Sequence, residues 1–136
     1  ETITRAGKDL GVAFQIRGDV LNLLPGDGYG KEFAGDLYEA KRTLILARLF
    51  SSIESEEKKS LKTLLAKKRQ DKTHSDIEIL LEAIYQHQAL SYAQSIAEEN
   101  AALGLTGLRQ SFDTLPNQTA AQALLYLLES LANRSK

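Results

Sequence analysis

Apolar residues recur along the chain at the three- and four-residue spacing of α-helices, and no stretch rivals this pattern with the alternation of a β-strand. The pattern, interrupted by prolines, glycines and polar turns, predicts helices over residues 4–24, 36–51, 52–68, 76–112 and 117–133. The 76–112 stretch is long for one straight helix, so we expect a break near residues 86–89. Gly104 and Gly107 mark a second candidate break. The sequence therefore predicts an all-α protein.

The predicted first helix is apolar nearly all round, which is typical of a helix buried in a core. A narrow polar stripe interrupts it, formed by Gly11, Gln15, Gly18 and Asn22, with Asp19 beside them. Burying Asp19 without a partner would cost roughly several kcal/mol. We therefore expect the stripe to face a polar cavity, a partner or a ligand. Gly11 and Gly18 indicate either close packing against another helix or room for a ligand.

A glycine-rich loop follows this helix and ends at Lys31, and the next predicted helix carries Lys41. The loop lacks the Walker phosphate-binding pattern, because Pro25 and Glu32 stand where that pattern requires a glycine and a Ser or Thr. On pattern alone the loop is predicted to be a structural turn, and Asp36 to be the N-cap of the following helix. The basic run over residues 67–72 is interpreted as favourable to the dipole of the helix before it.

Composition narrows the class of protein. The 136 residues are predicted to form one helical domain over 1–136, with a site-like region over 1–50 and scaffold helices over 51–136. A net charge of −1 gives no broad field to attract nucleic acid or anionic lipid. No apolar run reaches the length of a membrane span. The absence of cysteine suits a reducing cytosol, so a cytoplasmic location is predicted.

Between residues 11 and 44 the sequence resembles the second aspartate-rich region of the trans-isoprenyl (polyprenyl) diphosphate synthases. That region runs roughly as G-x-x-F-Q-x-x-D-D-x-x-D, a loop with G-K, then G-x-D-L-x-x-G-K-x-T. The matching residues are Gly11, Phe14, Gln15, Asp19, Gly30, Lys31, Gly35, Asp36, Leu37, Lys41, Thr43 and Leu44. The resemblance continues more weakly to the C-terminus. It covers this chain but only about half of a usual synthase.

The resemblance implies the C-terminal part of an isoprenoid-synthase-type helical bundle, with magnesium as cofactor. It implies a metal-binding role for Asp19 and diphosphate-binding roles for Gln15, Lys31, Asp36 and Lys41. The motif is degenerate at Gly18 and Asn22, where the family has aspartates. Because magnesium prefers anionic oxygen ligands, its binding is predicted to be weak or lost. Ala40 replaces a family glycine, which we interpret as a mild change because alanine is the better helix former.

In the family, two aspartate-rich motifs face each other across a cavity, and magnesium between them draws diphosphate off an allylic substrate. This chain has no first motif, so the chain alone is predicted to be inactive and its status as an enzyme is open. One hypothesis is a polyprenyl synthetase-like prenyltransferase of isoprenoid biosynthesis that binds a prenyl diphosphate, its N-terminal half supplied upstream or by another chain. The alternative is a non-catalytic homologue or regulatory partner subunit of a prenyl diphosphate synthase. The family commonly dimerises, so a homo- or heterodimer is expected.

Overall fold

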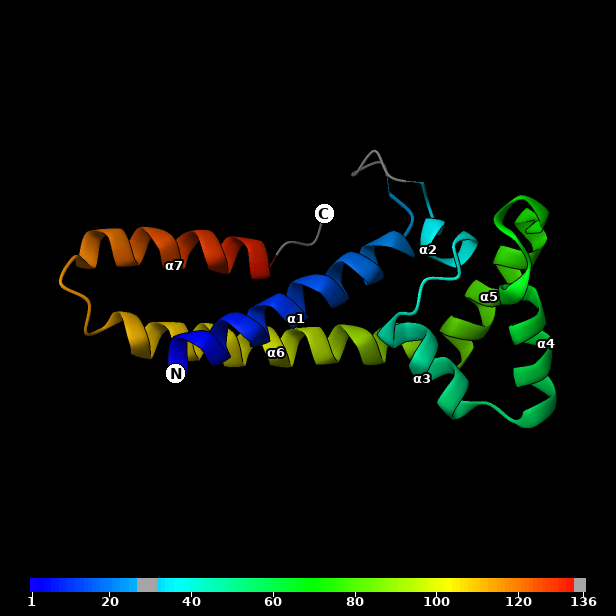
Figure 1. Ribbon diagram of the computed structural model, residues 1–136, viewed down its shortest axis with the longest axis horizontal. Coiled ribbons are helices and arrows are strands. Elements are labelled where there is room, and N and C mark those ends of the chain that lie inside the picture. The colour runs from blue at the N-terminus through cyan, green and yellow to red at the C-terminus, as the bar shows by residue number, and fades with distance from the viewer. Residues whose placement is uncertain (27–31, 134–136) are drawn as a thin grey trace. The chain divides into compact units, whose positions relative to one another are not determined.

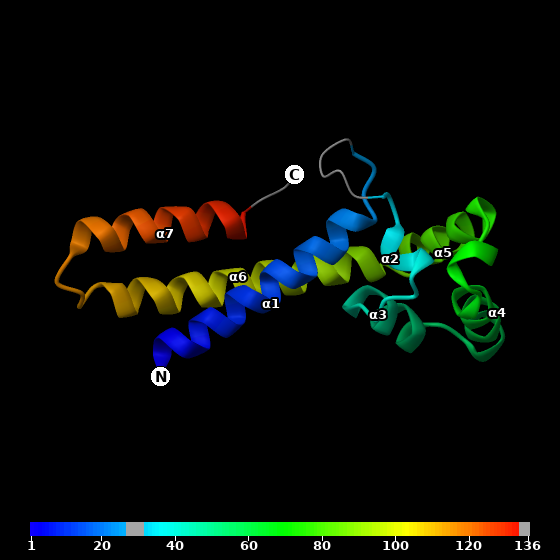
Figure 2. The ribbon, with the colours of Figure 1, turned by 45° about the horizontal axis from the view of Figure 1, so that its top comes forward.

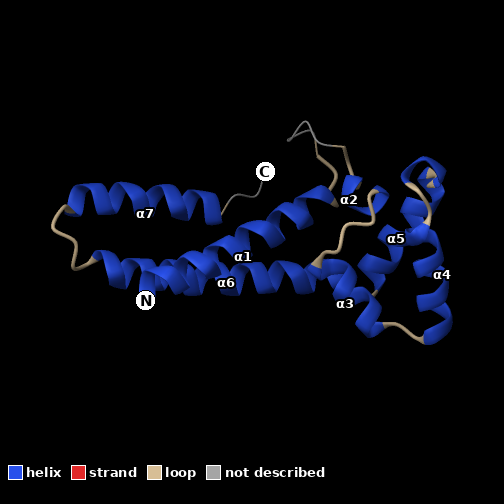
Figure 3. Cartoon of the chain, in the orientation of Figure 1, coloured by secondary structure: helices blue, strands red, loops and turns tan. Residues whose placement is uncertain are grey.

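The computed structural model describes residues 1–26 and 32–133, and every regular element within them is a helix (Figure 3). The elements are α1 (Thr2–Asn22), α2 (Gly35–Tyr38), α3 (Leu44–Ser52), α4 (Ser55–Ala66), the 3-10 turn η1 (Arg69–Asp71), α5 (His74–Gln86), α6 (Ala89–Phe112) and α7 (Gln118–Ala132). The predicted all-α class is confirmed. None of these helices is long and apolar enough to cross a membrane.

The chain divides into two compact units. The first comprises Glu1–Arg17 and Ser95–Lys136, and the second comprises Gly18–Gln94. α1 and α6 each contribute residues to both units. The predicted single domain, with its division at residue 50, stays a prediction.

In the first unit, the N-terminal part of α1, the C-terminal part of α6 and the whole of α7 pack together (Figure 1 and Figure 2). α7 runs back along α6 after the turn at residues 113–117, and the Asn117 side chain caps it by accepting from the Ala120 N–H at 3.0 Å. Five of the buried residues that cluster in the core of this unit are alanines, and the set is Ala6, Ala13, Ala101, Leu105, Leu108, Phe112, Ala121, Leu125 and Ala132. Small side chains allow the helices of this unit to pack closely.

Two glycines lie where α1 and α6 approach each other closely. A Cβ atom added at Gly104 would lie 2.6 Å from Leu10 Cγ and 2.9 Å from the Ala6 carbonyl oxygen. A Cβ atom added at Gly107 would lie 3.0 Å from the Ala6 Cβ. α6 is continuous through both glycines. The break predicted there is therefore wrong, because these glycines make room for α1 instead of ending a helix.

In the second unit, α5 packs against α2, α3 and α4. Among the described residues, the largest fully buried side chains all lie in this unit, and they are Leu37, Ile45, Leu49, Ile77, Leu80 and Ile84. α5 begins with a capping box between Thr73 and Asp76, and Lys67 Nζ lies 2.8 Å from the same carboxylate. The Lys67 ammonium holds the pKa of Asp76 below its usual value. At its other end α5 stops at Gln86, and α6 begins at Ala89, so the predicted break between them is confirmed.

α1 is not buried on all sides. Ala13 and Val20 are buried, whereas Val12 is 46% exposed and Phe14 is 57% exposed. The prediction of a helix apolar nearly all round was based on residue type, and it is wrong about burial for the described chain. One side of α1 meets the core, and another carries apolar residues that the described residues leave largely uncovered.

The predicted helix over residues 36–51 is also wrong, because the segment forms two helices. α2 is a single turn, and its N-cap is Ala34, so Asp36 lies inside the turn instead of capping it. α3 starts afresh after Thr43, whose side chain accepts from the Leu46 N–H at 3.3 Å. The start predicted for the next helix is wrong as well, because α4 begins at Ser55 and not at residue 52.

Ala40 lies between α2 and α3 with a φ angle of 52°, which is the left-handed region. The interpretation of Ala40 as a mild change within a helix is therefore wrong, because a residue with a Cβ atom is strained there by about 1–2 kcal/mol. Glycine adopts this conformation without that strain but loses more backbone freedom on folding.

We expect Ala40→Gly to raise the free energy of unfolding by about 0.5–1 kcal/mol, measured by urea denaturation. The matched control is Ala47→Gly, at an exposed position within α3, which should lower that free energy by about 1 kcal/mol. Equal losses for the two variants would contradict the left-handed conformation at Ala40.

Candidate functional site

Four residues of the motif meet in the second unit, where the last turn of α1 lies against α2. Asp19 and Asn22 come from α1, Asp36 comes from α2, and Lys41 follows α2 in the segment before α3. We call these four residues the Asp19 corner. The family resemblance implies a metal or diphosphate role for three of them, and Asn22 occupies a degenerate position of the motif.

Lys41 joins the two carboxylates of the Asp19 corner. Its Nζ donates to Asp19 Oδ1 at 2.7 Å and lies 3.7 Å from Asp36 Oδ2. Asp19 is 6% exposed. Because burying a lone carboxylate is costly, its charge needs a partner inside the protein, and the Lys41 ammonium is that partner. The hydrogen bond to Asp19 raises the pKa of Lys41. The Lys41 side chain itself is 45% exposed, so its ammonium is also open to solvent.

Asn22 ties α2 to the end of α1. Its Oδ1 accepts from the Asp36 N–H at 3.0 Å, and its backbone carbonyl accepts from the Ala34 N–H at 2.8 Å. The next residue is held as well, since the Tyr85 hydroxyl donates to the Leu23 carbonyl at 3.3 Å. The degenerate position 22 therefore has a structural role that needs an oxygen acceptor but no negative charge.

The glycines of the polar stripe do not serve helix packing among the described residues. A Cβ atom added at Gly11 or at Gly18 would meet no atom within 4 Å. Close packing against another described helix therefore does not explain these two glycines. Gly18, one residue before Asp19, leaves space that a larger side chain could occupy.

The other predicted site residues are Gln15 and Lys31. Gln15 lies at an exposed position of α1, in the stretch that belongs to the first unit. Lys31 lies outside the described residues. The predicted convergence of Gln15, Asp19 and Lys31 on one hollow stays a prediction.

The described donors of the corner do not fit a magnesium ion. Magnesium needs several oxygen ligands in a near-octahedral arrangement, with carboxylates among them. Gly18 offers no side chain, the Asn22 amide oxygen accepts from Asp36, and Asp19 binds the Lys41 ammonium. Across residues 1–26 and 32–133, no group of three or more His, Cys, Asp or Glu side chains could hold a metal. The metal-binding role of Asp19 stays a prediction.

Sequence reasoning missed two residues that contact the segment around α2. Lys72 donates to the Tyr38 carbonyl, and Arg69 pairs with Glu32 and Glu39. Both belong to the basic run that was interpreted only through the helix dipole. Contacts between residues thirty or more positions apart leave no local pattern, so nothing in the sequence could have identified these partners.

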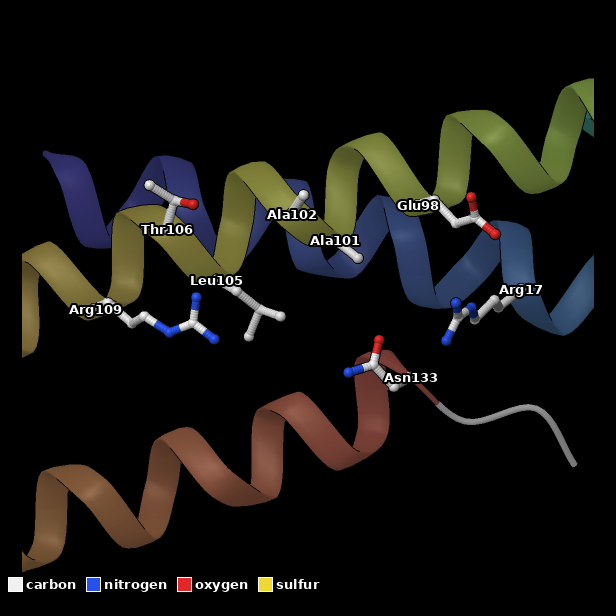
Figure 4. A pocket seen from close by; sticks show the side chains of 8 residues that line it. All are labelled: Arg17, Glu98, Ala101, Ala102, Leu105, Thr106, Arg109 and Asn133. Carbon is white, nitrogen blue, oxygen red and sulfur yellow. The ribbon is translucent and has the colours of Figure 1, made fainter.

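A separate groove lies in the first unit, between α6 and α7 (Figure 4). It has a volume of about 280 Å³, and its lining includes Arg17, Glu98, Leu105, Arg109 and Asn133. Its cations are engaged within the unit, since Arg17 donates to the Ala132 carbonyl and Arg109 pairs with Glu129. None of the predicted site residues within 1–26 and 32–133 lines this groove, and its shape and charges indicate no particular ligand.

A comparison with known families covers the segment that carries the Asp19 corner. The family model described as Polyprenyl synthetase matches residues 1–84 of the chain, which is more than half of it.

The chain belongs to the polyprenyl synthetase family.

Individual relatives extend the match beyond residue 84. The chain is 33% identical over 135 residues to a geranylgeranyl diphosphate synthase of Saccharolobus solfataricus, an alignment that covers 98% of the chain. It is 29% identical over 136 residues to a geranylfarnesyl diphosphate synthase of Natronomonas pharaonis, which covers 99% of the chain. The family resemblance found in the sequence is thereby confirmed.

The fold agrees with a solved structure of the same family. The crystal structure of a geranylgeranyl pyrophosphate synthetase from Pyrococcus horikoshii matches 98% of this chain with a TM-score of 0.80 and 26% identity. The aligned region is 39% of that structure, and 39% and 36% of the two relatives above. The chain therefore spans less than two fifths of each of these three proteins.

Proposed function

We propose that this chain acts in isoprenoid biosynthesis as part of a polyprenyl synthetase that binds a prenyl diphosphate, and that the chain alone transfers no prenyl group. The Asp19 corner carries the proposal, because it brings Asp19, Asp36 and Lys41 together within the family match. Lysine binds phosphate groups as a compact positive charge. Lys41 is half exposed and can meet such a group, and Lys31 would add a second cation.

The substrate class is proposed from the relatives, whose names are diphosphate synthases for geranylgeranyl and geranylfarnesyl products. Because the chain spans only 39% or less of them, the remaining part of such a protein would supply the other groups of the site, either upstream or on another chain. That requirement is the physical reason for proposing that the chain alone is inactive. The cytoplasmic location and the dimer that the resemblance implies belong to the same proposal.

A second candidate function is a non-catalytic homologue, or a regulatory partner subunit of a prenyl diphosphate synthase. The observation that favours it is the pair Gly18 and Asn22, which removes two carboxylates from the motif and leaves donors that do not fit magnesium. In this case α1 to α7 would serve as a binding surface for a catalytic chain, and no diphosphate would be held at the Asp19 corner.

Thermal unfolding of the purified chain in the presence of geranyl diphosphate separates the two functions. A ligand that binds only the folded state raises the melting temperature, with about 2.7 kcal/mol of stabilisation at a concentration one hundred times Kd. We expect millimolar geranyl diphosphate to raise the melting temperature of the wild type, and Lys41→Met to reduce that rise. Geraniol, which lacks the diphosphate, is the control ligand. No rise with or without magnesium would contradict diphosphate binding and favour the non-catalytic partner.

A further inference from the structure

The backbone of α2 depends on a distant side chain. The carbonyls of Gly35, Asp36 and Leu37 accept from backbone N–H groups of residues 39–41, at 2.9–3.1 Å. The carbonyl of Tyr38, the last residue of the turn, instead accepts from Lys72 Nζ at 2.7 Å. Carbonyls at the end of a helix lack partners within the helix, so an external donor satisfies the group that α2 cannot satisfy itself.

The surroundings of Lys72 favour its hydrogen bond to the Tyr38 carbonyl, because they bury its amine. It lies directly after η1 and is 7% exposed, although lysine is among the residues that are seldom buried. Withdrawal of the amine from water lowers the pKa of Lys72. A buried amine needs a hydrogen-bond acceptor, and the Tyr38 carbonyl provides it.

Arg69, in η1 itself, holds the segment on both sides of α2. Its guanidinium pairs with Glu32, which precedes α2, and with Glu39, which follows it. The same guanidinium lies over the Tyr38 ring, 5.6 Å from the ring centroid, within the range of a cation–π contact. Together with Lys72, it joins η1 to the region of α2 before, within and after the turn.

α2 needs such support because its own geometry is weak. It has four residues, too few for a helix to persist without tertiary contacts. It is flanked by Ala34 and Ala40, which both have positive φ angles although neither is glycine. Such conformations persist where the surrounding structure holds them in place.

We propose that Lys72 and Arg69 are positioning residues that hold α2 in the conformation that places Asp36 beside Lys41. Neither residue belongs to the Asp19 corner, and each acts through α2. The consequence for prenyl diphosphate binding rests on the proposed function, whereas the positioning of α2 can be measured without any ligand.

Hydrogen exchange of the backbone amides tests the proposal on the full chain. The probes are the N–H groups of Tyr38 and Lys41, which donate to the carbonyls of Ala34 and Asp36. In Lys72→Met we expect them to exchange about tenfold faster than in the wild type, while the amides of α5 keep their rates. The matched control is Lys68→Met, at an exposed position of the same basic run, which should leave both sets unchanged.

Arg69→Gln provides a second variant at a half-exposed side chain, which keeps the proposal testable if Lys72→Met does not fold. We expect it to accelerate exchange in α2 in the same direction, and Arg69→Lys to restore part of the protection. The proposal is overturned if the α2 amides in both variants exchange as in Lys68→Met. It is also overturned if α2 and α5 accelerate by the same factor, since that indicates general loss of stability.

Diphosphate binding gives a separate outcome. If geranyl diphosphate raises the melting temperature of the wild type, Lys72→Met should weaken that effect while Lys68→Met should not. An equal effect of geranyl diphosphate on these two variants would contradict the link between α2 and the site. If the wild type shows no rise, the proposed function fails, and the exchange rates alone decide whether Lys72 and Arg69 position α2.

Discussion

The Gly104→Val variant should lose about 2–3 kcal/mol of its free energy of unfolding. A Cβ atom at this position would already lie 2.6 Å from Leu10 Cγ and 2.9 Å from the Ala6 carbonyl oxygen. The carbonyl belongs to the backbone of α1, so it cannot relieve the clash by changing rotamer as a side chain can. The two added methyl groups of valine would therefore force α1 and α6 apart and expose part of the core that they share. Urea denaturation followed by circular dichroism measures the loss.

A second helical glycine supplies the matched control for this variant. Gly11→Ala places a Cβ atom where no described atom lies within 4 Å, so it should raise the free energy of unfolding by about 1 kcal/mol through helix propensity alone. The free energy of unfolding of Gly104→Ala should lie between those of these two variants. If Gly104→Val and Gly11→Ala had the same effect, the close approach of α1 and α6 would be wrong.

Restoring the two lost carboxylates, by Gly18→Asp together with Asn22→Asp, should create magnesium-dependent binding of geranyl diphosphate. The space beside Gly18 can take the new side chain, and Asp19 is its neighbour on α1. Three carboxylates give magnesium the anionic oxygens that the present donors lack. With ligand and metal at one hundred times Kd, the stabilisation is about 2.7 kcal/mol, which corresponds to a rise of several degrees in the melting temperature.

The change in the free energy of unfolding without metal distinguishes magnesium binding from a general stabilisation by the two substitutions. In a chelating buffer the double variant should be less stable than the wild type, because the added charges repel Asp19 and Asp36. Gly18→Asn is the matched control, since it adds a side chain of the same size without the charge, and it should not respond to magnesium. A double variant that ignores magnesium, with and without geranyl diphosphate, would show that the corner cannot serve as a metal site in this chain.

Much of the fold could be predicted because the residue patterns that indicate a helix lie within short stretches of sequence. The break between α5 and α6 follows from the length of the apolar pattern, and Asn117 is an N-cap residue by type. The family followed from the order of short motif elements, and the comparisons confirm it. These features depend on residues close together in the sequence, where spacing and residue preference carry the information.

The errors arose where a residue's role depends on what lies across from it. Gly104 is compatible with a helix break or with close packing, and only the position of Ala6 decides between them. Ala40 looks like a helical residue by type, yet the turn between α2 and α3 requires a left-handed backbone there.

The candidate site shows the same limit. The sequence correctly required a partner for the buried Asp19 but did not identify Lys41 as that partner. Lys72 and Tyr38 are 34 positions apart, and their contact exists only in the folded chain. The diphosphate-binding roles of Gln15, Lys31, Asp36 and Lys41 stay predictions.

Because the side-chain amide of Asn22 is neutral, its hydrogen bond should withstand changes of pH and the removal of metal. An uncharged acceptor keeps its hydrogen bond to the Asp36 N–H over a wide pH range and in the presence of EDTA, so this link between α1 and α2 requires no metal ion. Folding is thereby uncoupled from metal supply at this point. A lineage could lose its ion chemistry at the motif and still inherit an intact helical framework.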